Sequence, residues 1–139
     1  MRNKRFFLAG FCIYALLMLY LMFHRVPYAE RNCNLIPGRT IQAMIRLLGL
    51  RPSLRRLAIV NLFGNILMFL PLGLLPAIWE QQNHFPVYLL TVALSVCLLE
   101  AAQYLTRLGS ADVDDLLLNL LGASLGFLIW KWISGAKAA

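Results

Sequence analysis

The sequence predicts an all-α integral membrane protein, a bundle of four membrane-spanning helices with a short amphipathic helix between the first two spans. Hydrophobic residues make up 60% of the 139 residues, charged residues only 14%, and the mean hydropathy is +0.70. These values are typical of polytopic membrane proteins and not of soluble domains. Four apolar stretches are separated by polar segments. A helix needs about 20 residues to cross a bilayer, and the third and fourth stretches reach this length only with part of the polar segment between them. We therefore expect one membrane domain over residues 1–139.

The first span is expected over about residues 6–23. Arg2, Lys4 and Arg5 precede eighteen uncharged residues. A secretory signal peptide has a similar start, but its apolar region is usually about 7–15 residues long and ends in small residues. Here the stretch ends in Phe23 and His24, so we interpret it as a retained span.

A basic connection follows the first span. Residues 24–56 contain seven arginines and no lysine. Within them, residues 39–50 predict a short amphipathic helix that lies in the membrane interface; a solvated linker helix is the alternative. Pro52 and Ser53 end this element, with Ser53 as a candidate cap of the next helix. The apolar side of the amphipathic helix contains Ile41, Met44, Ile45 and Leu48, opposite Arg39, Gln42 and Arg46.

The remaining spans are expected over about residues 57–79, 85–105 and 115–133. Pro71, Gly73 and Pro76 interrupt the second span, and they predict a kink or local unwinding there. Gly122 and Gly126 in the fourth span form a face of small residues that lets a neighbouring helix come close. That neighbour belongs to this chain or, in an oligomer, to a second copy.

Polar residues are expected to converge on one membrane face. With four spans, the start of the second, the end of the third and the start of the fourth all lie on the same side of the bilayer. The uncharged stretch before Glu100 is too short to cross alone, so we expect this carboxylate below the membrane surface, where an ionisable group costs several kcal/mol and indicates function. Interhelical hydrogen bonds that only hold the bundle together are the alternative. The candidate polar residues of this pocket are Asn34, Pro37, Asn61, Asn65, Glu100, Gln103, Arg107, Asp112, Asp114, Asp115 and Asn119.

The membrane orientation is argued from charges. The connecting side carries eight positive residues and the terminal side five, and a plain count would place the connections in the cytoplasm. However, the first helix usually dominates, and the arginines of the connection can instead pair with acids or lipid phosphates. We expect the termini inside and the pocket outside. Trp79, Trp130 and Trp132 then form an aromatic belt on the terminal side.

In combination, the polar motifs resemble those of the VanZ-like family of small bacterial membrane proteins. The resemblance extends from about residue 32 to 127, and it departs at Gly38, where an aromatic residue commonly follows the proline. It implies a multi-pass protein of the bacterial cytoplasmic (inner) membrane, and the founding member of the family is linked to resistance against the glycopeptide teicoplanin. The matching pieces are Asn34-Leu-Ile-Pro37, Asn61-x-x-x-Asn65-x-x-x-Phe69-x-Pro71-x-Gly73, Glu100-x-x-Gln103-x-x-x-Arg107, Asp112-x-Asp114-Asp115 and Asn119-x-x-Gly122-x-x-x-Gly126.

Three functions remain open from the sequence. The first is binding of a membrane lipid or a lipid-linked envelope precursor, because arginine suits phosphate groups. The second is a membrane-embedded enzyme that uses Glu100 and an aspartate as an acid–base pair or to hold a divalent cation, although no motif identifies catalytic residues. The third is a scaffold without a ligand.

The net charge of +7 lies beside the spans and not in a separate basic domain, so we expect no nucleic acid as a partner. His24 and His84 fall on opposite sides and the three cysteines show no ligand spacing, so we expect no metal site and no cofactor.

Overall fold

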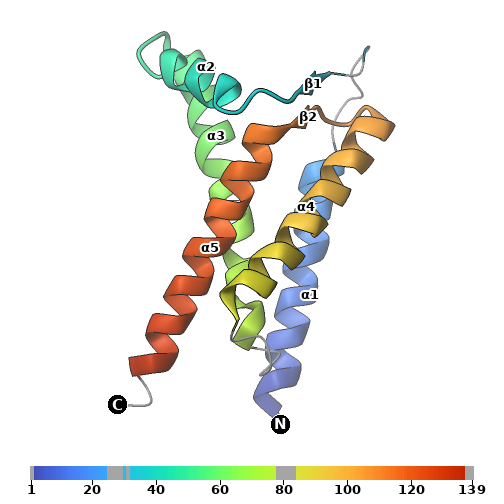
Figure 1. The fold of residues 1–139 in the computed structure, drawn as a ribbon, viewed down its shortest axis with the longest axis vertical. Helices are drawn as coiled ribbons and strands as arrows, with labels where there is room; N and C mark the ends of the chain where they lie inside the picture. The colour runs from blue at the N-terminus through green and yellow to red at the C-terminus, as the bar shows by residue number, and fades with distance from the viewer. Residues whose placement is uncertain (1, 25–29, 31, 78–83, 137–139) are drawn as a thin grey trace.

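The computed structural model describes residues 2–24, 30, 32–77 and 84–136. It is a helical bundle in which a short two-stranded sheet joins two of the connections (Figure 1). Four helices are long and apolar enough to cross a membrane, which confirms the expected fold class. In chain order the elements are α1 (Arg2–Phe23), β1 (Cys33–Asn34), α2 (Arg39–Leu47), α3 (Pro52–Phe69), the 3-10 helix η1 (Leu70–Ala77), α4 (Phe85–Thr106), β2 (Ala111–Asp112) and α5 (Val113–Ala136).

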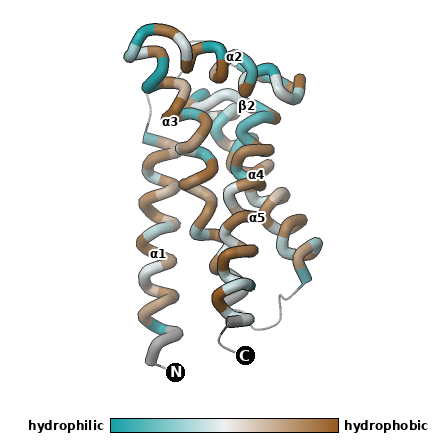
Figure 2. The backbone as a smooth tube through the Cα atoms, turned by 90° about the vertical axis from the view of Figure 1, so that its left-hand side faces the viewer, coloured by the Kyte–Doolittle hydropathy of each residue, from teal (hydrophilic) through white to brown (hydrophobic). Residues whose placement is uncertain are grey.

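The two ends of the bundle differ in character. Both termini lie at one end, whereas α2 and the two strands lie at the other (Figure 1). Hydrophilic residues gather at the α2 end, and the long helices between the ends are mostly hydrophobic (Figure 2). Trp130 and exposed Trp132 lie in the last turns of α5, at the terminal end, as expected; Trp79 lies outside the described residues. The chain is a multi-pass membrane protein.

The second span begins earlier than expected, and its expected end near residue 79 lies outside the described residues. It begins at Pro52 and not near residue 57, because proline is well tolerated in the first helical turn, where its missing N–H would have no partner. Arg51 is the N-cap residue, so the proposed capping role of Ser53 is wrong. The expected local unwinding is confirmed: the α-helix ends at Phe69 and continues as η1. Pro71 cannot donate the main-chain hydrogen bond that an α-helix requires there.

The glycines of α5 bring α3, η1 and α5 into backbone contact. A Cβ atom built at Gly122 would overlap the backbone of Ile66, and one built at Gly126 would overlap the carbonyl oxygen of Leu70. Gly73 of η1 lies against Gly126 in the same way. The expected close approach is therefore made within the chain. An oligomer formed through Gly122 and Gly126 stays a prediction.

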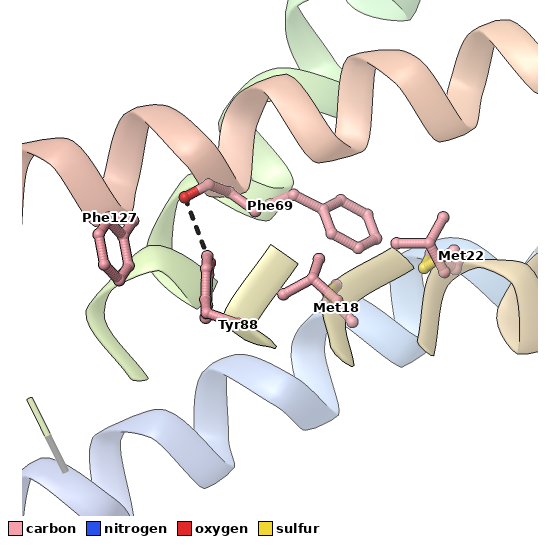
Figure 3. Packing of buried hydrophobic residues seen from close by; sticks show 8 residues of the cluster. Met18, Met22, Phe69, Tyr88 and Phe127 are labelled. Atoms are coloured by element: carbon pink, nitrogen blue, oxygen red, sulfur yellow. Dashed lines mark hydrogen bonds between the residues drawn. The ribbon is translucent and has the colours of Figure 1, made fainter. Parts of the chain in front are cut away.

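A hydrophobic core lies where α1, α4, α5 and the end of α3 meet. Met18, Met22, Phe69, Tyr88 and Phe127 point toward one another there (Figure 3). The Tyr88 hydroxyl donates a hydrogen bond to the carbonyl oxygen of Ala123 at 3.2 Å, which satisfies its polar group inside the core. The aromatic ring of Tyr88 stacks on Phe127. These contacts hold α1 and α4 against α5.

The strands β1 and β2 connect two parts of the chain that are far apart in sequence. They pair in parallel, with Cys33 opposite Ala111 and Asn34 opposite Asp112. This pairing brings the first connection to the start of α5. Helix α2 forms within the expected residues 39–50 and packs on α3 and the start of α5. Its place in the membrane interface stays a prediction.

Candidate functional site

Asp114 anchors the start of α2. Its carboxylate is fully buried in the first turn of α5. It accepts hydrogen bonds from the backbone N–H groups of Gly38 at 2.5 Å, Thr40 at 2.7 Å and Ile41 at 3.1 Å. The first N–H groups of a helix have no partner inside the helix and carry partial positive charge. Asp114 therefore caps α2 from another part of the chain, and Gly38 adopts the left-handed conformation that this turn needs, with φ of 82°.

Asp112 completes this anchor. Its Oδ1 atom accepts hydrogen bonds from Asn34 Nδ2 at 3.0 Å and from the Asp114 N–H at 2.9 Å, and its Oδ2 atom accepts one from the Thr40 hydroxyl at 2.5 Å. Asn34 Nδ2 also lies 3.0 Å from Thr40 Oγ1. Pro37 is exposed in the turn before α2 and takes no part in this set. We call Asn34, Thr40, Asp112 and Asp114 the anchor network. It gives two candidate site carboxylates a structural role.

Glu100 lies beside the anchor network, at the wall of a pocket. Its side chain is 9% exposed, and its Oε2 atom accepts a long hydrogen bond of 3.4 Å from the Asp112 N–H. The pocket has a volume of about 340 Å³. It opens on the outer surface of the bundle, because Leu35, Cys97 and Ala101 in its lining are exposed. We call it the lateral pocket; its lining residues are Leu35, Cys97, Glu100, Ala101, Tyr104, Ala111, Asp112, Val113 and Leu116.

Gln103 and Arg107 do not join Glu100 in the pocket. Gln103 is buried, and its Nε2 atom donates to the carbonyl oxygen of Met22 at 3.0 Å, which ties α4 to the end of α1. Arg107 is exposed and takes a left-handed conformation with φ of 61° just after α4 ends. Arg107 does not continue the helical face of Glu100 and Gln103, because α4 stops at Thr106.

The remaining candidates lie on α3 and α5. Asn65 Nδ2 donates a hydrogen bond to Asp115 Oδ1 at 2.6 Å, and this bond crosses between the two helices. The Oδ1 atoms of Asn61 and Asn119 are buried and have no hydrogen-bond partner within the described part of the chain. None of these four residues lines the lateral pocket. The candidates thus form the anchor network, the pocket wall at Glu100, and a separate seam between α3 and α5.

The sequence reasoning missed three residues of this region. Thr40 belongs to the anchor network, and Cys97 and Tyr104 line the lateral pocket. A signal for the pocket was present: Cys97, Ala101 and Tyr104 recur at helical spacing beside Glu100, and the first two are small. Small side chains on one helical face leave a recess where larger ones would fill it. Thr40 carried no comparable signal, since its partner lies 72 residues away.

The described residues form no group of three or more His, Cys, Asp or Glu side chains that could hold a metal ion. The donors that surround Asp112 and Asp114 are N–H, amide and hydroxyl groups of the protein itself. The arrangement is therefore suited to hold a loop rigidly and to present one nearly buried carboxylate, that of Glu100, to an apolar pocket.

The chain was compared with known proteins. A search of curated proteins and a search of solved structures each found no significant match. A family model described as VanZ/LLP1 matches residues 11–134, which covers nearly the whole chain. That range includes α3, α4, nearly all of α5, the anchor network and the lateral pocket. The chain therefore belongs to the VanZ/LLP1 family.

Proposed function

We propose that the protein binds a membrane lipid or a lipid-linked envelope component of the bacterial cytoplasmic membrane in the lateral pocket. The observation that carries this proposal is the position of Glu100, a 9% exposed carboxylate in the wall of an apolar recess on the outer surface of a membrane-spanning bundle. A carboxylate in such surroundings costs several kcal/mol, and an ionisable residue inside the membrane is by default a candidate for a functional site.

The chemistry of the pocket favours a ligand with hydrogen-bond donors near an apolar chain. A carboxylate offers roughly four lone-pair positions, so Glu100 can accept a donor of a ligand in addition to its partners within the protein. Hydroxyl, amide and ammonium groups of a lipid headgroup are such donors. The volume of about 340 Å³ lies at the lower end of the range of about 300–1,000 Å³ for small-molecule pockets. A headgroup or a segment of chain fits, while the rest of the lipid stays in the bilayer.

The anchor network supports this function by fixing one wall of the pocket. Asp112 belongs both to the network and to the pocket lining. The preceding residue, Ala111, is held by its N–H hydrogen bond to the Asn32 carbonyl oxygen at 3.1 Å. A wall that is rigid before binding lowers the entropy cost of binding.

The proposed orientation places both termini in the cytoplasm. The lateral pocket, at the α2 end of the bundle, then opens toward the outer leaflet. A ligand there is a component on its way to, or part of, the cell envelope. This placement connects the proposal to the teicoplanin resistance of the family's founding member.

Replacing Glu100 tests the proposal. Glu100→Gln removes the negative charge but keeps an oxygen that can accept the Asp112 N–H, so the fold should persist. Glu30→Gln is the matched control, because Glu30 is exposed and outside the pocket. Lipids that co-purify with each detergent-extracted variant are identified by mass spectrometry, alongside thermal unfolding and the teicoplanin tolerance of the cells. Loss of a charged hydrogen bond of about 1.5–3 kcal/mol should reduce the bound lipid about tenfold or more.

The outcomes separate binding from a purely structural role. The proposal requires that Glu100→Gln loses lipid and tolerance while its unfolding temperature stays near that of Glu30→Gln. Full retention of lipid and tolerance would reject it. If Glu100→Gln fails to fold, Ala101→Leu replaces it, since Ala101 is exposed at the pocket and a larger side chain there fills the recess without changing charge. Unchanged lipid in that folded variant would reject the proposal equally.

A further inference from the structure

A second groove lies between α1 and α3. It has a volume of about 490 Å³ and is lined on one side by Leu17 and Leu21 of α1 and on the other by Val60, Gly64 and Leu67 of α3. Most of these side chains are more than half exposed, so the groove faces outward. The Tyr14 hydroxyl donates a hydrogen bond to the carbonyl oxygen of Met68. This bond joins α1 and α3 at the end of the groove that lies farther from α2. It shares no lining residue with the lateral pocket.

The length of the groove matches one leaflet of a bilayer. Val60 and Met68 mark its two ends on α3, and eight helical residues span about 12 Å. Half of a hydrocarbon core of about 30 Å is about 15 Å. The walls are apolar except for Tyr14 and Asn65. An acyl chain that enters from the α2 end therefore remains within the leaflet on that side.

The mouth of the groove is basic. Arg56 is exposed and lies one helical turn before Val60, on the face of α3 that lines the groove. Side chains of a helix point back toward its N-terminus, which at this position is toward the membrane surface. Arg51 and Arg55 are exposed beside it, and the sequence contains no acidic residue between Glu30 and Glu80. The guanidinium group binds phosphate oxygens in bidentate fashion, and clusters of arginine at a membrane surface attract anionic lipid.

From this combination we infer that the α1–α3 groove is a binding site for an anionic phospholipid. One acyl chain lies between Leu17 and Leu21 of α1 and Val60, Gly64 and Leu67 of α3, and the phosphate binds Arg56. The site is separate from the lateral pocket, and it serves the leaflet at the α2 end of the bundle.

Two variants test the two halves of this site. Arg56→Gln removes the phosphate contact, with Arg46→Gln on the exposed side of α2 as the control for charge. Gly64→Leu fills the groove; a Cβ atom at Gly64 meets nothing within 4 Å, so this variant should fold. Gly135→Leu is its control, since a Cβ atom there also meets open space and Gly135 lies near the end of α5.

The measurement uses purified protein in nanodiscs that contain equimolar phosphatidylglycerol and phosphatidylethanolamine. After transfer to detergent, native mass spectrometry counts the phosphatidylglycerol molecules that stay bound. Arg56→Gln should retain about tenfold less, as expected for the loss of one charged hydrogen-bonding contact. Gly64→Leu should also lose the lipid, whereas both controls should stay within about twofold of the unaltered protein, because screening weakens distant charges.

Three results would overturn the inference. Equal losses in Arg56→Gln and Arg46→Gln would show attraction to the whole basic surface and no site. Unchanged phosphatidylglycerol in folded Gly64→Leu would show that the groove is not occupied. If the unaltered protein retains as much phosphatidylethanolamine as phosphatidylglycerol, the negative charge of the lipid does not determine binding. Each result leaves the separate test of Glu100 unaffected.

Discussion

The Asp114→Asn substitution tests the anchor network most sharply. The carboxylate accepts three backbone N–H groups: Oδ1 accepts from Gly38, and Oδ2 accepts from Thr40 and Ile41. An asparagine has one side-chain oxygen, which can still accept the hydrogen bonds from the Thr40 and Ile41 N–H groups. Its amide N–H₂ group would then face the Gly38 N–H, and two donors cannot form a hydrogen bond. One charged hydrogen bond of about 1.5–3 kcal/mol is lost, and the other two fall to the strength of neutral bonds. We expect local destabilisation of about 3 kcal/mol.

Hydrogen exchange of backbone amides measures this effect directly. A decrease of about 3 kcal/mol in the free energy of local unfolding raises the exchange rates of the Thr40 and Ile41 amides about 100-fold, since each 1.4 kcal/mol is a factor of ten. Exchange in the middle of α4 should stay unchanged. Asn34→Ala is the control, because it removes side-chain bonds of the same network but leaves the cap of α2 in place. If the exchange rates of Thr40 and Ile41 in Asp114→Asn stay within about threefold of the unaltered protein, the assigned role of Asp114 is wrong.

Three further predictions address the packing, the orientation and α2. Gly126→Ala should destabilise the bundle by about 1–3 kcal/mol or more, measured by unfolding in detergent, because the added methyl group meets backbone; unchanged stability would contradict the backbone contact. With the native cysteines replaced, a cysteine at exposed Arg107 should react with an impermeant thiol reagent on intact cells and one at exposed His84 should not, and the reverse pattern would invert the orientation. Replacing Ile45 and Leu48 with Glu should abolish the proposed contribution to teicoplanin tolerance while the spans still insert, because charge on that face opposes membrane contact; an unchanged contribution would make α2 a solvated helix.

The helices could be predicted from the sequence because their signals are local. Apolar length predicted the four spans, and Pro71, Gly73 and Pro76 predicted the local unwinding that the structure shows as a 3-10 helix. Gly122 and Gly126 predicted a close helix contact, but the sequence did not identify the partner. The start at Pro52 was missed because the expected span began only where the arginines end.

The tertiary contacts of the candidate site could not be predicted. Asp114 binds Thr40 across 74 residues of sequence, and no local pattern identifies such a pair. The sequence therefore grouped all the aspartates with Glu100 as functional groups, whereas Asp112 and Asp114 mainly hold the first connection. Arg107 was grouped with Glu100 in one pocket because a left-handed helix end at a residue other than glycine is uncommon. Glu100 itself was chosen as a candidate because the apolar stretch before it is short.

A site-specific crosslink tests the central claim, lipid binding beside Glu100. A small diazirine side chain replaces Cys97, which lines the lateral pocket, or Leu98, which is 73% exposed on the bilayer side of the same helix. After irradiation of intact cells, mass spectrometry identifies the lipids attached at each position. We predict that position 97 is enriched in one class of lipid with a donor-bearing headgroup, that this enrichment disappears in Glu100→Ala, and that position 98 reports the bulk lipid composition. Identical lipid profiles at positions 97 and 98 would contradict the claim.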